Sequence, residues 1–176
     1  MFNDLSLNCR ENQLNSALEN FLKAVELTNN NDIQGAIIYL NLSTINYKLS
    51  KYKISKPDLT ISEQSIQWAL EYAHMANDLI ILNEENKVGV DVQSKGLVFE
   101  DITLIGIFSL SFLKAFSTYS IAMCRKAKLQ YSEAIYKFQE AYNMISKIED
   151  QWELKTTIMA HLVDLKSKMR VIVRLD

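Results

Sequence analysis

The chain has 176 residues, 48% of them hydrophobic, with a formal net charge of -2 at pH 7 and a pI near 5.8. This length suffices for one domain or two small modules that share a core, and the charge leaves no broad basic surface for nucleic acid. Four glycines and one proline are few for a protein rich in β-turns, so the composition predicts an all-α fold.

The first predicted helix covers residues 11–28, and a tight turn at residues 29–32 leads into a second helix over residues 33–51. One apolar stripe defines the first helix, and it consists of Leu14, Ala17, Leu18, Phe21, Ala24 and Val25. Such a stripe is typical of a helix that buries one face.

The second predicted helix is apolar on two opposite faces when its residues are placed 100° apart. One face carries Ile33, Ala36, Ile37 and Leu40, and the other carries Ile38, Leu42, Ile45 and Leu49. A second apolar face must be covered, so these last four residues are the candidate partner-binding site. The alternative is that this face packs within the chain, around Ile105, Phe108 and Phe112.

A connection with the only proline, Pro57, precedes a third predicted helix that starts at Thr60 and ends near Leu82. Residues 84–96 are polar and contain two glycines, which favours a linker. Three more helices are predicted over residues 97–126, 131–148 and 150–174. The sequence therefore predicts two three-helix modules, residues 1–83 and 97–176, packed together.

The helix pair that begins at Leu14 recurs 98 positions later without a gap. Under this shift the first stripe falls on Phe112, Ala115, Phe116, Tyr119, Ala122 and Met123, and the second helix falls on residues 131–138. An internal duplication is the favoured interpretation, because both helices and the turn between them stay in register. The back face of the second copy is mostly polar but includes Tyr136, which joins the candidate partner-binding residues.

No residue pattern indicates catalysis, a metal or a cofactor. His74 and His161 have no ligand partners at suitable spacing, and Cys124 has neither a nearby histidine nor a nucleophile signature. Cys9 and Cys124 show no CxxC spacing, so we expect reduced thiols. Glycine-rich phosphate loops are lacking, and we expect no small-molecule substrate. Trp68 and Trp152 lie among apolar neighbours and are predicted in the core.

Membrane insertion and export are also not expected. Residues 1–10 are polar and include Asp4, so they do not form a signal peptide. The longest uncharged run, Ile102 to Leu113, has 12 residues, whereas a spanning helix needs about 20. We therefore expect this run in the core.

Two families of helical hairpin proteins resemble parts of the chain. Three segments resemble the second-helix signature of tetratricopeptide repeats, namely Ala17-x3-Phe21-x2-Ala24, Ala69-x3-Ala73-x2-Ala76 and Ala134-x3-Phe138-x2-Ala141. The 34-residue period of those repeats is missing. The alternative is a tandem microtubule-interacting-and-trafficking (MIT) domain. The segment 20–27 leading into 35–38, and the segment 130–135 leading through the final helix, resemble the C-terminal early-autophagy-targeting region of autophagy-initiating serine/threonine kinases.

The kinase resemblance implies a non-catalytic fragment whose bundles dock short amphipathic segments of a regulatory adaptor protein. It also implies a cytoplasmic protein that is recruited to membranes where autophagosomes form. Two other interpretations remain open. The first is a degenerate tetratricopeptide-type scaffold. The second is a helical enzyme or ligand carrier with a pocket between the modules, near His161 or Cys124.

Overall fold

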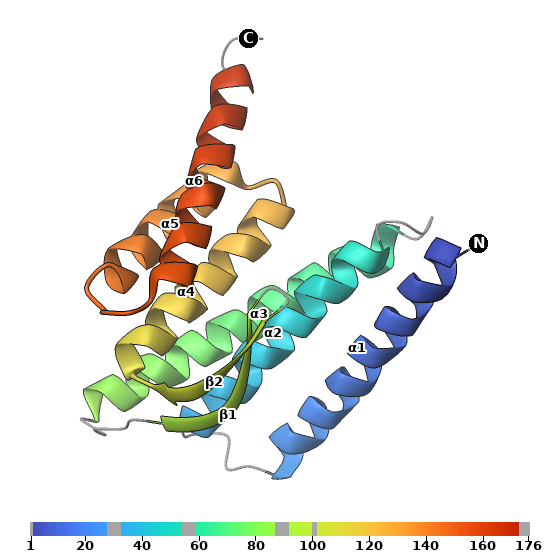
Figure 1. Ribbon diagram of the computed structural model, residues 1–176, viewed down its shortest axis with the longest axis horizontal. Coiled ribbons are helices and arrows are strands. Elements are labelled where there is room, and N and C mark those ends of the chain that lie inside the picture. The colour runs from blue at the N-terminus through green and yellow to red at the C-terminus, as the bar shows by residue number, and fades with distance from the viewer. Residues whose placement is uncertain (1, 28–32, 54–58, 87–91, 100–101, 173–176) are drawn as a thin grey trace.

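The computed structural model describes residues 2–27, 33–53, 59–86, 92–99 and 102–172 (Figure 1). Within these ranges the chain forms six helices and one two-stranded sheet. The helices are α1 (Phe2–Leu27), α2 (Ile33–Lys53), α3 (Leu59–Glu85), α4 (Leu110–Ala127), α5 (Tyr131–Ile145) and α6 (Trp152–Ile172). The strands are β1 (Val92–Phe99) and β2 (Ile102–Phe108). The predicted helical class and the number of helices are confirmed for this part of the chain.

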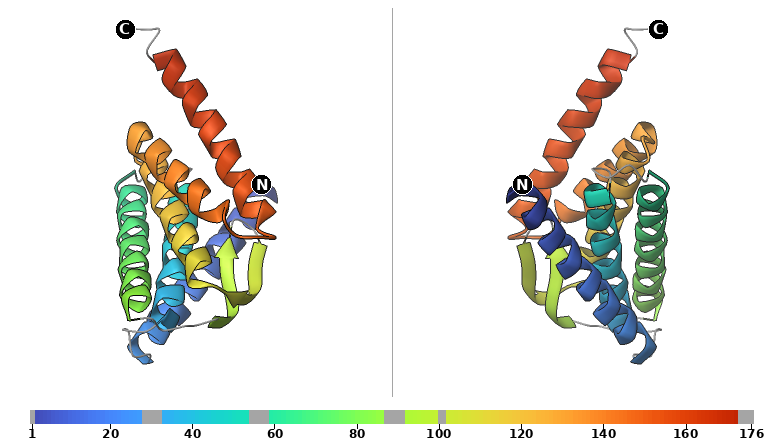
Figure 2. Two further views of the ribbon diagram at one scale, coloured as in Figure 1. Left: turned by 90° about the vertical axis from the view of Figure 1, so that its left-hand side faces the viewer. Right: turned by 90° about the vertical axis from the view of Figure 1, so that its right-hand side faces the viewer.

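Each helix packs on the next one in the chain, from α1 to α6. Helix α2 is the central helix, because it also contacts β1 and α4. In the side views α3 lies on one side of the molecule, whereas the hairpin and the start of α6 lie on the other (Figure 2). Of the α2 residues 33–51, only Gln34 and Lys51 are exposed. Both apolar faces of α2 are therefore largely covered within the chain, and Ile38 is half-buried.

The β-hairpin corrects the predicted long helix over residues 97–126. Strands β1 and β2 pair antiparallel, with Val92 opposite Phe108 and an irregular register between Ser94 and Leu97. Helix α4 begins only at Leu110, after Ser109, whose Oγ accepts a hydrogen bond from the Phe112 N–H at 3.2 Å. The hairpin belongs to the core, because Leu97 and Phe108 are buried.

One hydrophobic core cluster extends from α2 to α6 and includes the hairpin. An aromatic series runs through it, in which Phe108 stacks on Phe112 with ring centroids 5.1 Å apart and Phe112 stacks on Phe116 at 6.2 Å. Six inward residues are predicted for the last helix, and four of them, Leu154, Ile158, Leu162 and Leu165, are buried. Met169 is half-buried, and Ile172 lies outside the residues whose side chains are described. Helical periodicity thus identified the core side of this helix correctly.

Polar side chains connect α3 and α4. Glu84 belongs to α3 and forms an ion pair with Lys114, which corrects its predicted place in a solvated linker. Nearby, the Ser117 hydroxyl donates a hydrogen bond to Asn77 Oδ1 at 3.0 Å. The two predicted modules are therefore joined by polar contacts as well as by the shared core.

Candidate functional site

The apolar back face of α2 was the candidate partner-binding site, and the structure places most of it in the interior. Leu42, Ile45 and Leu49 have exposed fractions of 0%, 2% and 1%, and Ile38 is half-buried. Leu42 lies in the same core cluster as Phe108, as the alternative interpretation proposed. These side chains stabilise the chain's own fold and offer no surface to a partner. The docking interpretation of this face is corrected accordingly.

Tyr136, the fifth candidate residue, lies on the surface of α5. Its side chain is 67% exposed, and the Lys137 ammonium lies 5.7 Å from its ring centroid. Because Leu42, Ile45 and Leu49 are interior while Tyr136 is solvent-exposed, the five candidate residues do not form one site.

The apolar stripe of α1 is only partly covered by neighbouring helices in the part of the chain that is described. Its six predicted stripe residues, Leu14, Ala17, Leu18, Phe21, Ala24 and Val25, are all half-buried. None of the side chains of residues 10–27 is fully buried, whereas four side chains of α6, the last helix of the chain, are fully buried. The reason is that α1 packs on α2 alone among the principal contacts between elements. One side of the stripe therefore remains accessible.

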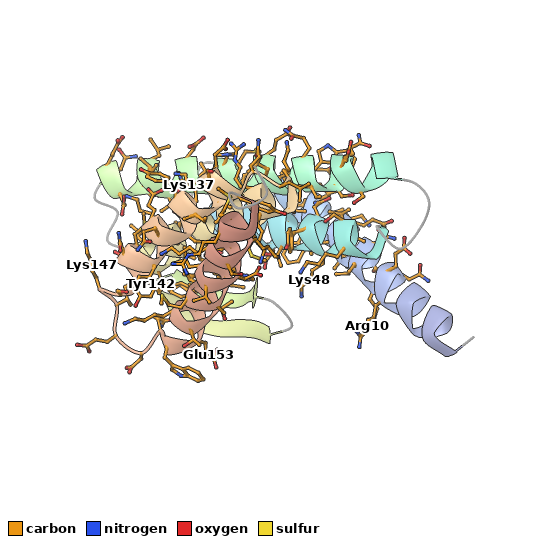
Figure 3. The ribbon with its side chains drawn as sticks, turned by 90° about the horizontal axis from the view of Figure 1, so that it is seen from above. Arg10, Lys48, Lys137, Tyr142, Lys147 and Glu153 are labelled. Carbon is orange, nitrogen blue, oxygen red and sulfur yellow. The ribbon has the colours of Figure 1, made fainter. Side chains whose placement is uncertain are left out.

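The surroundings of the α1 stripe are suited to an amphipathic partner. Leu22, at the edge of the stripe, is 39% exposed, and Leu27, at the end of the helix, is 87% exposed. Exposed charged side chains, including Glu19 and Lys23, lie on the opposite side of α1 from the stripe. Figure 3 shows Arg10 of α1 pointing away from the body of the molecule. An accessible apolar strip on one side of a helix is a surface against which an amphipathic helix can pack.

Cys124 lies in an apolar part of the α3–α4 interface. It is 1% exposed and belongs to a cluster with Ala69, Leu70, Ala73 and Ile121. Burial raises the pKa of this thiol to about 12, so the thiol stays protonated at neutral pH. A protonated buried thiol is a poor nucleophile, which gives no support to an enzyme built around this cysteine.

His161 belongs to a polar contact that joins α6 to α4. Its Nδ1 lies 3.2 Å from the Lys126 Nζ, which also donates a hydrogen bond to Asp164 Oδ2 at 2.8 Å. The imidazole ring stacks on Phe138 with ring centroids 5.1 Å apart. The hydrogen bond from Lys126 is the main cause that holds the pKa of Asp164 below its usual value. These contacts fix the position of α6 and are consistent with a structural histidine.

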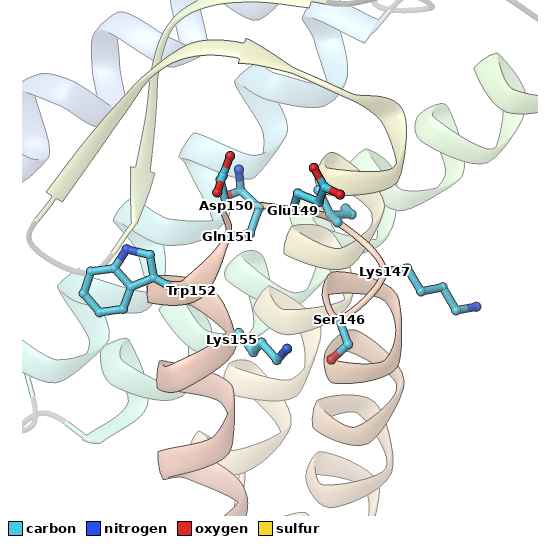
Figure 4. Close-up of a pocket in the computed structure, with 8 residues that line it drawn as sticks. Ser146, Lys147, Glu149, Asp150, Gln151, Trp152 and Lys155 are labelled. Atoms are coloured by element: carbon cyan, nitrogen blue, oxygen red, sulfur yellow. The ribbon is translucent and has the colours of Figure 1, made fainter.

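A hollow of about 530 Å³ lies at the turn between α5 and α6 (Figure 4). Its lining comes entirely from residues 146–155, so it does not lie between the two halves of the chain. Figure 4 shows Lys147 and Trp152 pointing away from its centre. Among the residues that the structure describes, no three His, Cys, Asp or Glu side chains are placed to hold a metal ion.

Two exposed apolar lines were missed by the sequence reasoning, which placed both tryptophans in the core. Trp68 and Met75 of α3 are 43% and 42% exposed, and Trp152 and Met159 of α6 are 69% and 41% exposed. The signal was present, because a tryptophan is followed by a methionine seven positions later in both helices. A seven-residue spacing returns to nearly the same side of a helix, so each tryptophan and its methionine form one exposed line.

Comparison with known proteins leaves the family open. No protein-family model, curated protein or solved structure matches the chain. The resemblance to MIT domains therefore depends on the sequence segments alone. None of the helices in the described ranges combines the length and apolar character needed to cross a membrane.

Proposed function

We propose that the chain is a helical interaction scaffold that docks a short amphipathic segment of a partner protein along α1. The observation that carries the proposal is the half-covered stripe of α1, which is apolar over its length but packs on one neighbour. Covering the remaining half of four large apolar side chains contributes about 3–6 kcal/mol before the cost of ordering. Such a gain favours weak, reversible docking.

The partner class follows from the resemblance to the tandem MIT region of autophagy-initiating kinases. We propose a regulatory adaptor protein as the partner, with cytoplasmic action and recruitment to membranes. In this proposal the docked segment lies beside α1 and α2 and completes a three-helix arrangement at that end of the molecule. Binding would use α1 in place of the back face of α2, since Leu42, Ile45 and Leu49 are interior.

A tetratricopeptide-type scaffold is the second candidate. It is favoured by the packing of each helix on the next in chain order, which is the arrangement of helical solenoids. A solenoid of this kind binds partners across a surface formed by several helices. The two candidates thus differ in whether a partner contacts α1 alone or a series of helices.

Site-specific photocrosslinking in cells distinguishes these candidates. A photoreactive phenylalanine analogue would replace Leu18 or Val25 of α1, and Leu82 of α3 is the control position because it is 44% exposed. We expect both α1 positions to capture the same peptide, with apolar residues spaced three, four and seven apart. Capture of that peptide from α3 as well would favour the solenoid, and failure of both α1 positions to capture it would refute docking on α1.

A further inference from the structure

The outer surface of α3 combines apolar and acidic side chains. Trp68, Met75 and Leu82 recur every seven residues and are 43%, 42% and 44% exposed. Helix α3 contains no lysine or arginine, and its exposed acidic residues are Glu63, Glu71, Asp78 and Glu85. The surface defined by Trp68, Met75, Leu82, Glu71, Asp78 and Glu85 is called the acidic face.

The outer surface of α6 has the same apolar pattern with the opposite charge. Trp152, Met159 and Val163 fall on one side of the helix and are 69%, 41% and 64% exposed. Basic residues on α6 outnumber acidic ones, and they are Lys155, Lys166, Lys168 and Arg170. The surface defined by Trp152, Met159, Val163, Lys155, Lys166 and Arg170 is called the basic face. Lys168 lies on the other flank of the helix, where its ammonium is 3.1 Å from Asp164 Oδ2.

The two faces belong to helices that are not among the principal packing pairs of the molecule. Helix α6 begins on the side of the molecule away from α3, and its C-terminal end projects beyond the other helices (Figures 1 and 2). The faces therefore do not meet within one copy of the chain. They meet only when two copies come together.

We propose that the acidic face of one copy binds the basic face of a second copy, so that the chain associates head to tail. A contact between two acidic faces, or between two basic faces, would bring like charges together at an apolar interface, which is unfavourable. Only the contact between unlike faces pairs opposite charges while it covers both apolar lines. The lines also match in length, since 11 to 14 residues of helix span about 16–21 Å.

A head-to-tail contact has a definite consequence for assembly. Such a contact uses two different surfaces, so every added copy presents a new acidic face or a new basic face. The association continues as an open chain unless the rotation between copies closes a ring. Neither face includes α1, and this inference is therefore independent of the proposed docking on that helix.

Charge-swap variants test the proposal by sedimentation velocity. One variant carries Glu71→Lys and Asp78→Lys, and the other carries Lys166→Glu and Arg170→Glu; all four side chains are exposed, so the fold should persist. We expect the wild type to associate at low salt, each variant alone to associate at least about tenfold more weakly, and an equimolar mixture of the two variants to regain association. Circular dichroism verifies that the helical content of each variant is unchanged.

A matched control is Glu19→Lys with Glu26→Lys, which reverses two exposed carboxylates on α1 and should leave the association constant unchanged. Raising the salt to about 1 M, where the screening length falls to about 3 Å, should weaken association of the wild type. A monomeric wild type at millimolar concentration would overturn the proposal. So would association that survives either swap, or a mixture of the two variants that stays monomeric.

Discussion

Leu42→Ala tests whether the back face of α2 is core or a docking surface. The Leu42 side chain is 0% exposed and lies in the main core cluster. Replacing a buried leucine with alanine removes apolar contacts and leaves a cavity, which typically costs about 2–5 kcal/mol. A value of about 3 kcal/mol should lower the melting temperature by about 6–12 °C for a chain of this size.

The matched control is Leu82→Ala on α3, where the side chain is 44% exposed. Both substitutions place alanine in a helix, so the change in helix propensity is the same and only burial differs. We expect the control to melt within about 2 °C of the wild type, since exposed positions change stability by about 0.5 kcal/mol. Thermal unfolding followed by circular dichroism measures both variants. A Leu42→Ala protein that melts like the control would show that this side chain is not core.

Three further predictions concern single side chains. Asp164→Asn should make the melting temperature depend less on pH in the acid range. The lowered pKa of Asp164 gives stability that is present at neutral pH and is lost as the pH falls below about 4. Melting temperatures from pH 2 to 7 measure this small effect. In a Cys9→Ser background, Cys124 should not react with a thiol reagent at pH 8 until denaturant is added, and reaction in the native state would contradict its burial. Ser109→Ala should lower the unfolding free energy by about 1 kcal/mol in denaturant titrations because α4 loses its N-cap, and an unchanged midpoint would argue against the cap.

Periodicity predicted the helices well where one face is apolar. The stripe of the final helix, including Ile158 and Leu162, is buried as expected, because spacings of three and four residues follow the helical turn. The two opposite apolar faces of α2 were also informative, because both of them had to be covered by other parts of the chain or by a partner. The sequence could not say whether that cover came from the chain or from a partner, because this depends on long-range packing.

The hairpin was missed because uncharged apolar residues were read as a continuous helix. Residues 97–108 are rich in β-branched and aromatic residues, including Val98, Ile102 and Ile107, which favour strands. The charged pair Glu100 and Asp101 divides this stretch into two short apolar runs, and runs of that length suit strands better than a long helix. For the exposed surface of α3, helical periodicity predicts which residues lie on the same side as Trp68. It does not predict whether another element of the chain covers that side.

The central position of α2 has a consequence for how the molecule opens. Because α2 touches α1, α3, α4 and β1, it separates from the rest only when most of the structure unfolds. Its amide protons should therefore exchange with solvent at the slowest rate, set by global unfolding, whereas those of α1 exchange through a local event that releases one contact. The end of the molecule that we propose for docking is thus the end that can detach while the remaining helices stay folded.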